Sequence, residues 1–281
     1  MNLENNKVFI VGEIGLNANG SLKIAKKLID MAKECGCDAV KFQKRNPDIC
    51  IPSWKKNEIK ETPWGKITYM DYKKKIEFNR NDYNEIDKYC KVKKIEWFAS
   101  AWDLDSLSFL KKYNLKYNKL ASPLLTNESL VKAIANEKKM TFISTGISDF
   151  SIIDNVVSIF HEKKCPFILL HCVSTYPTID SEINLNMIPI LHDRYKCDIG
   201  FSDHSKGILA SSLAVMLKAK VIEKHITLDR TSFGTDQANS IERRGLELIV
   251  RNIRNVDKML GDGIKKVLEE EKIKLESIKY W

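Results

Sequence analysis

Eight short apolar runs alternate with eight longer amphipathic segments along the chain, and this alternation limits the possible folds more than any other feature. The apolar runs are rich in β-branched and aromatic residues, which favour strands. The predicted strands cover residues 8–14, 39–43, 97–100, 118–122, 141–145, 167–173, 199–202 and 221–226. The segments between them repeat apolar residues at helical spacing. The predicted helices cover residues 22–35, 84–94, 106–113, 129–137, 154–163, 183–195, 208–217 and 241–260.

A strand followed by a helix, repeated eight times, is the pattern of one α/β fold, the (β/α)8 or TIM barrel. A doubly wound open sheet is the alternative, but the G-x-G-x-x-G turn that such sheets carry after the first strand is absent. We predict a barrel domain over residues 1–265 and a charged helical tail over residues 266–281. The connection at residues 44–81 is too long for a tight turn, and loops of this length are usually functional or mobile.

Composition narrows the class of protein. A hydrophobic content of 43% is ample for a buried core, and no apolar run approaches the roughly 20 residues of a membrane span. Seven cysteines without a C-x-x-C pair indicate free thiols in a reducing compartment, so we expect a cytoplasmic protein with no membrane partner. The formal charge of +9 comes from lysine-rich patches with interspersed acids, which favours a solvated surface over a nucleic-acid-binding one.

Polar residues cluster where the predicted strands end. In a barrel of this kind the active site lies at the C-terminal ends of the strands, so these side chains are the candidates for function. They are Glu13, Lys41, Gln43, Ser100, Lys119, Ser122, Ser144, Thr145, Ser174, Tyr176, Ser202, His204, Glu223 and His225. Every strand contributes at least one residue, which predicts a single polar pocket.

Two kinds of side chain point to particular chemistry. A lysine inside an apolar strand is costly to bury unless it meets an anion or a carboxylate. This favours an anion-binding pocket at Lys41 and Lys119, with a structural salt bridge as the alternative. His204 and His225 end consecutive strands, so they either share a divalent metal or form a hydrogen-bonded pair in the core. His171 is a third candidate ligand, although its apolar neighbours favour a core role. These residues together indicate a metal-assisted enzyme that acts on a small phosphorylated or carboxylated substrate.

Eight ordered strings resemble the motifs of the sialic acid synthase family. They are VGEIGLNANG from Val11, VKFQ from Val40, KLAS from Lys119, ISTG from Ile143, HCVSTYP from His171, GFSDH from Gly200, EKHITLD from Glu223 and GTDQANS from Gly234. The resemblance covers about residues 7–265. It implies a homodimeric transferase that condenses phosphoenolpyruvate with an N-acylated hexosamine, such as N-acetylmannosamine or its 6-phosphate. The implied products are a nine-carbon 2-keto sugar acid and phosphate, which leaves by C–O cleavage.

The resemblance also implies roles for individual residues. Catalytic roles fall on Glu13, Lys41, Lys119 and Asp236. Substrate-binding roles fall on Gln43, Ser100, Ser122, Ser144, Ser174, Tyr176 and Ser202. His204 and His225 would bind a divalent metal, expected to be Mn²⁺ with Mg²⁺ and Co²⁺ as alternatives, and Asp203 would orient one of the neighbouring side chains.

Some positions depart from the family pattern. Ala18 replaces a usual histidine, Leu124 replaces an acidic residue of bacterial synthases, and Gln237 stands where Asp-His is frequent. We also expect no antifreeze-like domain after the barrel, so the 44–81 connection, the tail or a separate protein would complete the sugar site, unless sugar binding is weak. Two other functions stay open: a different phosphoenolpyruvate-dependent sugar-acid synthase on the same barrel, and a non-catalytic barrel that binds a nonulosonate or regulates a partner.

Overall fold

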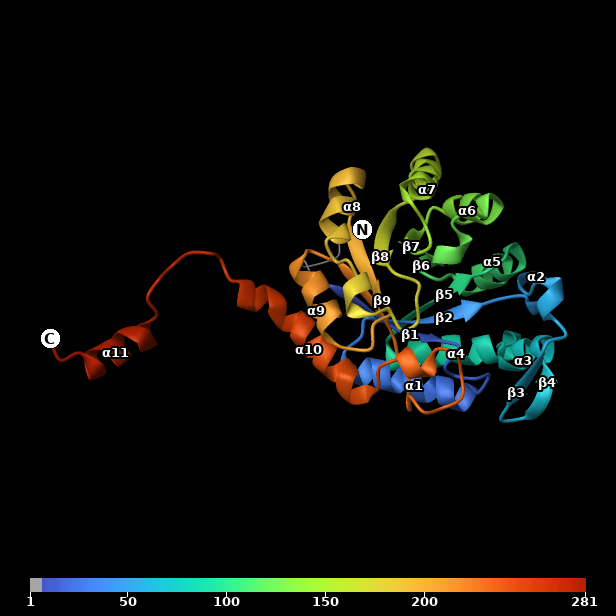
Figure 1. Cartoon of the computed structure of the whole chain (residues 1–281), viewed down its shortest axis with the longest axis horizontal. Coiled ribbons are helices and arrows are strands. Elements are labelled where there is room, and N and C mark those ends of the chain that lie inside the picture. The colour runs from blue at the N-terminus through green and yellow to red at the C-terminus, as the bar shows by residue number, and fades with distance from the viewer. Residues whose placement is uncertain (1–6) are drawn as a thin grey trace.

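The computed structural model describes residues 7–281, apart from the side chain of residue 257, and eight parallel strands close into a barrel (Figure 1). Around the barrel the strands follow the order β1-β10-β9-β8-β7-β6-β5-β2. Their bounds are β1 (Phe9–Gly15), β2 (Ala39–Lys44), β5 (Glu96–Ala101), β6 (Tyr117–Leu120), β7 (Met140–Ser144), β8 (Phe167–Cys172), β9 (Ile199–Asp203) and β10 (Val221–His225). The predicted (β/α)8 barrel and its eight strands are confirmed.

Helices between the strands cover the barrel. They are α1 (Leu22–Cys35), α4 (Arg80–Lys93), α5 (Leu104–Leu110), α6 (Glu128–Ala135), α7 (Phe150–Glu162), α8 (Met187–Tyr195), α9 (Leu209–Met216) and α10 (Arg243–Leu260). Local sequence sets their ends: Ser21 caps α1 by accepting a hydrogen bond from the Ile24 N–H, and Gly36 ends it at a φ of +91°. The helix predicted to begin at residue 84 begins at Arg80, because Asn79 and Asp82 form a capping box.

Aromatic side chains fill the barrel interior below the polar pocket. The ring of Phe142 lies 5.9 Å from that of Phe9, 5.4 Å from that of Phe98 and 5.3 Å from that of Tyr117, measured between centroids. Residues two apart on a strand share a face, so Ser100, Lys119 and Ser144 lie on the same interior face, one layer nearer the C-terminal ends of the strands. The aromatic layer therefore closes one end of the barrel and leaves the pocket open at the other.

The long connection after β2 has a structure of its own. It contains α2 (Pro47–Cys50), a 3-10 turn (Ser53–Lys55), the hairpin strands β3 (Ile59–Thr62) and β4 (Gly65–Thr68), and α3 (Tyr69–Ile76). Thr68 caps α3 by accepting a hydrogen bond from the Asp71 N–H. The rings of Trp64 and Tyr72 pack on Phe233, which anchors this insertion beside the loop that follows β10. Residues 47–76 are hereafter called the insertion.

The last helix, α11 (Glu269–Ile278), buries no residue, and Figure 1 shows it extending away from the barrel. Across residues 7–281, every helix is too short or too polar to cross a bilayer. All seven cysteines are free thiols.

Candidate active site

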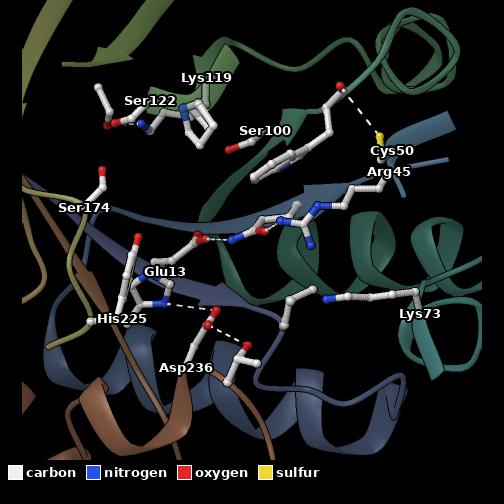
Figure 2. A pocket seen from close by; sticks show the side chains of 18 of the residues that line it. Glu13, Arg45, Cys50, Lys73, Ser100, Lys119, Ser122, Ser174, His225 and Asp236 are labelled. Carbon is white, nitrogen blue, oxygen red and sulfur yellow. Dashed lines mark hydrogen bonds and ion pairs between the residues drawn. The ribbon is translucent and has the colours of Figure 1, made fainter. Parts of the chain in front are cut away.

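One cavity of about 510 Å³ opens at the C-terminal ends of the strands (Figure 2). Of the strand-end candidates, Thr145 does not line it, because its hydroxyl donates a hydrogen bond to the Leu170 carbonyl oxygen at 3.1 Å. All thirteen residues to which the family resemblance gives a catalytic, substrate-binding or metal-binding role do line it. They are Glu13, Lys41, Gln43, Ser100, Lys119, Ser122, Ser144, Ser174, Tyr176, Ser202, His204, His225 and Asp236. Side chains from every barrel strand or the loop that follows it therefore meet in one place.

Four charged side chains form the base of the pocket. Lys41 Nζ lies 3.0 Å from Glu13 Oε1 and 3.6 Å from Glu223 Oε1, and Lys119 Nζ lies 3.9 Å from Glu223 Oε1. Strand register explains the first contact, because Glu13 and Lys41 are paired neighbours on β1 and β2. Two lysines balance two carboxylates, which is how four nearly inaccessible charges are accommodated.

Mutual pairing sets the protonation of this cluster. Burial alone would raise the pKa of Glu223, but Lys119 and Lys41 lower it to about 2. Burial opposes the charge of Lys41, yet Glu13 and Glu223 raise its pKa above the usual value. Burial lowers the pKa of Lys119 and raises that of Glu13. Lys41 and Glu223 are therefore held charged, while Glu13 takes up a proton more readily than an exposed glutamate.

Hydroxyl groups surround the two lysines. Lys41 Nζ donates a hydrogen bond to Ser100 Oγ at 3.3 Å, and Lys119 Nζ donates one to Ser144 Oγ. The Gly146 N–H donates to Ser122 Oγ at 3.0 Å. A Cβ atom at Gly146 would overlap Ser174 Oγ, so only glycine allows the backbone to approach these side chains. Ammonium, hydroxyl and backbone donors thus converge as an anion site requires.

His204 and His225 lie side by side in the pocket, with ring centroids 5.8 Å apart. His204 Nδ1 is 2.6 Å from the carbonyl oxygen of Val173, which can only accept, so Nδ1 carries the proton and the lone pair is on Nε2. Burial, followed by repulsion from His225, lowers the pKa of His204 to about 4. The ring is therefore neutral, and Nε2 lies 3.1 Å from the hydroxyl oxygen of Tyr176.

These two histidines fit a divalent metal ion. His225 Nδ1 is buried without a hydrogen-bond partner among the described residues, and Asp236 Oδ2 lies 3.9 Å from it. Among the side chains that the structure describes, no group of three or more His, Cys, Asp or Glu residues is arranged to hold a metal. An ion at this pair would therefore take its remaining ligands from water or substrate, as catalytic metals often do.

Two expectations about neighbouring residues are settled by the geometry. Asp203 does not orient Ser202 or His204: it faces the opposite side of β9, where its carboxylate accepts from the Ser205 N–H and lies 2.9 Å from Lys224 Nζ. The alternation of side chains along a strand explains this, because residues 202 and 203 must point to opposite faces. His171 is a core residue, with Nε2 2.7 Å from the Ile183 carbonyl oxygen.

Three of the departures from the family pattern, Ala18, Leu124 and Gln237, lie outside the cavity lining. Ala18 and Leu124 both belong to the buried hydrophobic core. Gln237 is buried and donates a hydrogen bond from Nε2 to the Asn17 carbonyl oxygen at 3.1 Å, which joins the loops after β10 and β1. These three side chains therefore belong to the packed interior and not to the cavity lining.

Sequence reasoning missed three cationic residues and gave Glu223 no role. Arg45, Lys55 and Lys73 line the cavity, and Glu223 bridges the two buried lysines. Arg45 lies two residues beyond Gln43, so the same alternation that identified Lys41 and Gln43 could have found it. Lys73 lies on α3, whose position depends on how the insertion folds back, and no local pattern shows that.

Comparison with known proteins agrees with this geometry. Residues 28–265 match the NeuB family. The chain is 35% identical to the N,N'-diacetyllegionaminic acid synthase of Campylobacter jejuni, over 94% of this chain and 81% of that protein. It is 35% identical to the human N-acetylneuraminate-9-phosphate synthase, over 92% of this chain and 73% of that protein.

A solved structure is equally similar. The N-acetylneuraminic acid (sialic acid) synthetase from Leptospira borgpetersenii, in complex with citrate, superimposes with a TM-score of 0.86 at 35% identity. The match covers 99% of this chain and 95% of that chain. The chain therefore belongs to the NeuB family, which includes synthases of sialic acid and related nonulosonic acids.

Proposed function

We propose that this protein condenses phosphoenolpyruvate with an N-acylated hexosamine to form a nine-carbon 2-keto acid and inorganic phosphate. The observation that carries the proposal is one pocket in which two buried lysines and several hydroxyls adjoin two buried histidines, His204 and His225. The names of the relatives support it, because they are synthases of such sugar acids. A non-catalytic barrel would not need to bury four charges in this arrangement.

The inner pocket suits phosphoenolpyruvate. The phosphate and carboxylate of phosphoenolpyruvate would accept hydrogen bonds from Lys119, Ser122, Ser144 and Ser174. Lys41 and Ser100 lie beside these four residues. Charge-assisted hydrogen bonds from buried donors bind such anions strongly and hold the enol carbon in place. The sugar would lie towards Gln43, Tyr176 and Asp236.

His204 and His225 would hold a divalent metal, which we propose is Mn²⁺, with Mg²⁺ and Co²⁺ as alternatives. When bound, the ion would supply Lewis acidity that polarises the aldehyde oxygen of the sugar. C3 of the enol forms a bond to the aldehyde carbon, water adds at C2, and the C2–O bond breaks so that the bridging oxygen leaves with phosphate.

Glu13 and Asp236 are the groups we assign to proton transfer. Oε1 of Glu13 accepts a hydrogen bond from Gln43 Nε2 at 2.9 Å, whereas Oε2 is buried and lacks a hydrogen-bond partner among residues 7–281. Oε2 is thus the atom left to exchange a proton with a bound substrate. Burial raises the pKa of Glu13 above its usual value, so this carboxylate accepts a proton more readily than an exposed one.

Phosphate release from phosphoenolpyruvate tests the proposal. We expect release only when Mn²⁺ and an acyl hexosamine such as N-acetylmannosamine or its 6-phosphate are both present, and none after chelation. His204→Ala should abolish release, whereas His161→Ala, which alters an exposed histidine on α7, should not. Release that depends on an aldose phosphate without an acylamino group would instead indicate the alternative synthase. No release with any sugar would refute catalysis of this kind.

We further propose that the protein is a cytoplasmic homodimer. The family resemblance supports the dimer, and seven free cysteines are typical of a reducing compartment. Sedimentation velocity would test the dimer directly, and a purely monomeric species at enzyme concentrations that support turnover would contradict it.

A further inference from the structure

The outer part of the pocket carries three cationic side chains that the inner chemistry does not use. Arg45 follows β2, and Lys55 and Lys73 belong to the insertion; all three line the same cavity as Glu13. Figure 2 shows Arg45 and Lys73 entering the pocket from the side opposite Ser122 and Ser174. These three cations are called the outer cationic lobe.

The lobe has more positive than negative charge. The carboxylates that line the cavity are Glu13, Glu77, Glu223 and Asp236. Glu13 and Glu223 pair with the inner lysines, and Glu77 pairs with Lys44 at 2.7 Å. Asp236 alone is left for three cations, and none of the three forms an ion pair within residues 7–281. The lobe therefore has an excess of two positive charges.

Protein contacts hold these cations in place. The Arg45 guanidinium stacks 3.8 Å from the Trp102 ring and donates a hydrogen bond from Nη2 to Gln43 Oε1. Lys73 Nζ lies 5.4 Å from the centroid of the Tyr69 ring, and Lys55 Nζ lies 4.6 Å from the same ring. Aromatic faces orient cations without neutralising them. The lobe is thus arranged in advance for an anion.

Burial makes an anion at this place favourable. Loss of water lowers the pKa of Arg45, and loss of water together with repulsion from Arg45 lowers the pKa of Lys73 to about 8. A bound anion would relieve both effects, because it returns a charge partner to groups that have lost solvent. Gln43 contacts both Arg45 and Glu13, so the lobe directly adjoins the inner site.

We propose that the outer cationic lobe binds a phosphate monoester on the acyl hexosamine, so that the sugar substrate is phosphorylated at the end opposite its aldehyde. This inference rests on the proposed function, which places the aldehyde beside the histidines and the sugar towards Gln43. Because Gln43 contacts Arg45, the far end of the sugar would then reach the lobe. A phosphate dianion matches an excess of two positive charges, and arginine with lysine is a common phosphate-binding set. A neutral hydroxymethyl group would leave the excess charge unmatched.

Calorimetric binding without phosphoenolpyruvate tests this inference independently of catalysis. N-acetylmannosamine 6-phosphate should bind about 10- to 100-fold more tightly than N-acetylmannosamine, as expected for charge-assisted hydrogen bonds. Lys73→Met and Arg45→Met should each remove most of that difference, and Lys73→Arg should retain it. Lys74→Met is the matched control, because Lys74 is the next residue of α3 but is exposed and pairs with Asp48. It should bind both sugars as the unmodified protein does.

The outcomes separate this inference from the proposed condensation. Tight, Lys73-dependent binding of the sugar phosphate without phosphate release from phosphoenolpyruvate would support the lobe and refute the condensation. Condensation at equal kcat/KM for the two sugars would support the reaction and overturn the inference that the lobe binds the sugar phosphate. Equal affinity for both sugars, or no binding of either, also overturns it. If Lys119→Met weakens binding of the sugar phosphate and Lys73→Met does not, the phosphate lies in the inner pocket, and the inference is also overturned.

Discussion

Two buried histidines show how surroundings decide what a residue does. His171 Nε2 lies 2.7 Å from the Ile183 carbonyl oxygen and its ring stacks on Phe201, outside the pocket. His204 uses its Nδ1 for a similar hydrogen bond and leaves Nε2 towards the pocket. The same residue type is thus structural in one place and available for chemistry in the other.

His171 should make stability depend on pH. Burial lowers its pKa from the usual 6.5, despite the opposing hydrogen bond to Ile183. Below pH 6.5 the unfolded chain therefore takes up a proton that the folded protein does not, and the free energy of unfolding falls by up to about 1.4 kcal/mol per pH unit. His171→Gln should be less stable than the unmodified protein above this pH, and the difference should shrink on acidification.

Urea unfolding between pH 7.5 and 5, a range that spans the ordinary histidine pKa of about 6.5, would measure this effect. His161→Gln is the control for loss of an exposed histidine. A constant difference between His171→Gln and the unmodified protein over the whole range would show that His171 does not titrate as described.

At the scale of elements, the strands were predictable and the insertion was not. Each strand is a buried apolar run bounded by polar residues, so hydrophobic pattern alone identifies it. The elements of the insertion are short, polar and partly exposed, and its hairpin depends on long-range packing of Trp64 against Phe233. The site residues on strands could therefore be predicted, whereas Lys73 could not.

Gly20 is the point where the β1–α1 loop meets α3. Its φ is +72°, and a Cβ atom there would overlap the carbonyl oxygen of Lys75. Gly20→Ala should lower the free energy of unfolding by about 1–3 kcal/mol, because both the backbone conformation and the contact are disfavoured. Thermal or urea unfolding would measure this loss.

Gly65→Ala is the control for backbone strain, because Gly65 lies in the hairpin of the insertion. Gly65 has a φ of +101°, but a Cβ atom added there would meet nothing within 4 Å. It should therefore lose less stability than Gly20→Ala. Equal losses in the two variants would show that close packing of α3 against Gly20 contributes nothing.

At the scale of the whole molecule, closure of the barrel creates the site. Thirteen residues spread from position 13 to position 236 reach one cavity because the strands run parallel and end together. This is why knowledge of the fold, together with side-chain alternation, was enough to predict most of the pocket. The chemical role of each residue remains a prediction, because shape alone does not assign a reaction.

We propose that the folded unit ends with α10 and that the tail does not stabilise it. Ile249 of α10 is fully buried, whereas α11 has no buried residue. Deletion of residues 263–281 should change the free energy of unfolding by less than about 0.5 kcal/mol. Ile249→Ala should reduce it by about 2–5 kcal/mol. A large loss of stability on deletion would show that the folded unit extends into the tail.

The most direct test of the proposed reaction follows an oxygen isotope label at the bridging position of phosphoenolpyruvate. We predict that with Mn²⁺ and the acyl hexosamine 6-phosphate, phosphate and the nine-carbon keto acid form in equal amounts and all of the label appears in phosphate. Label retained in pyruvate, with no nine-carbon product, would reveal simple hydrolysis at phosphorus and contradict the assignment of this pocket to condensation.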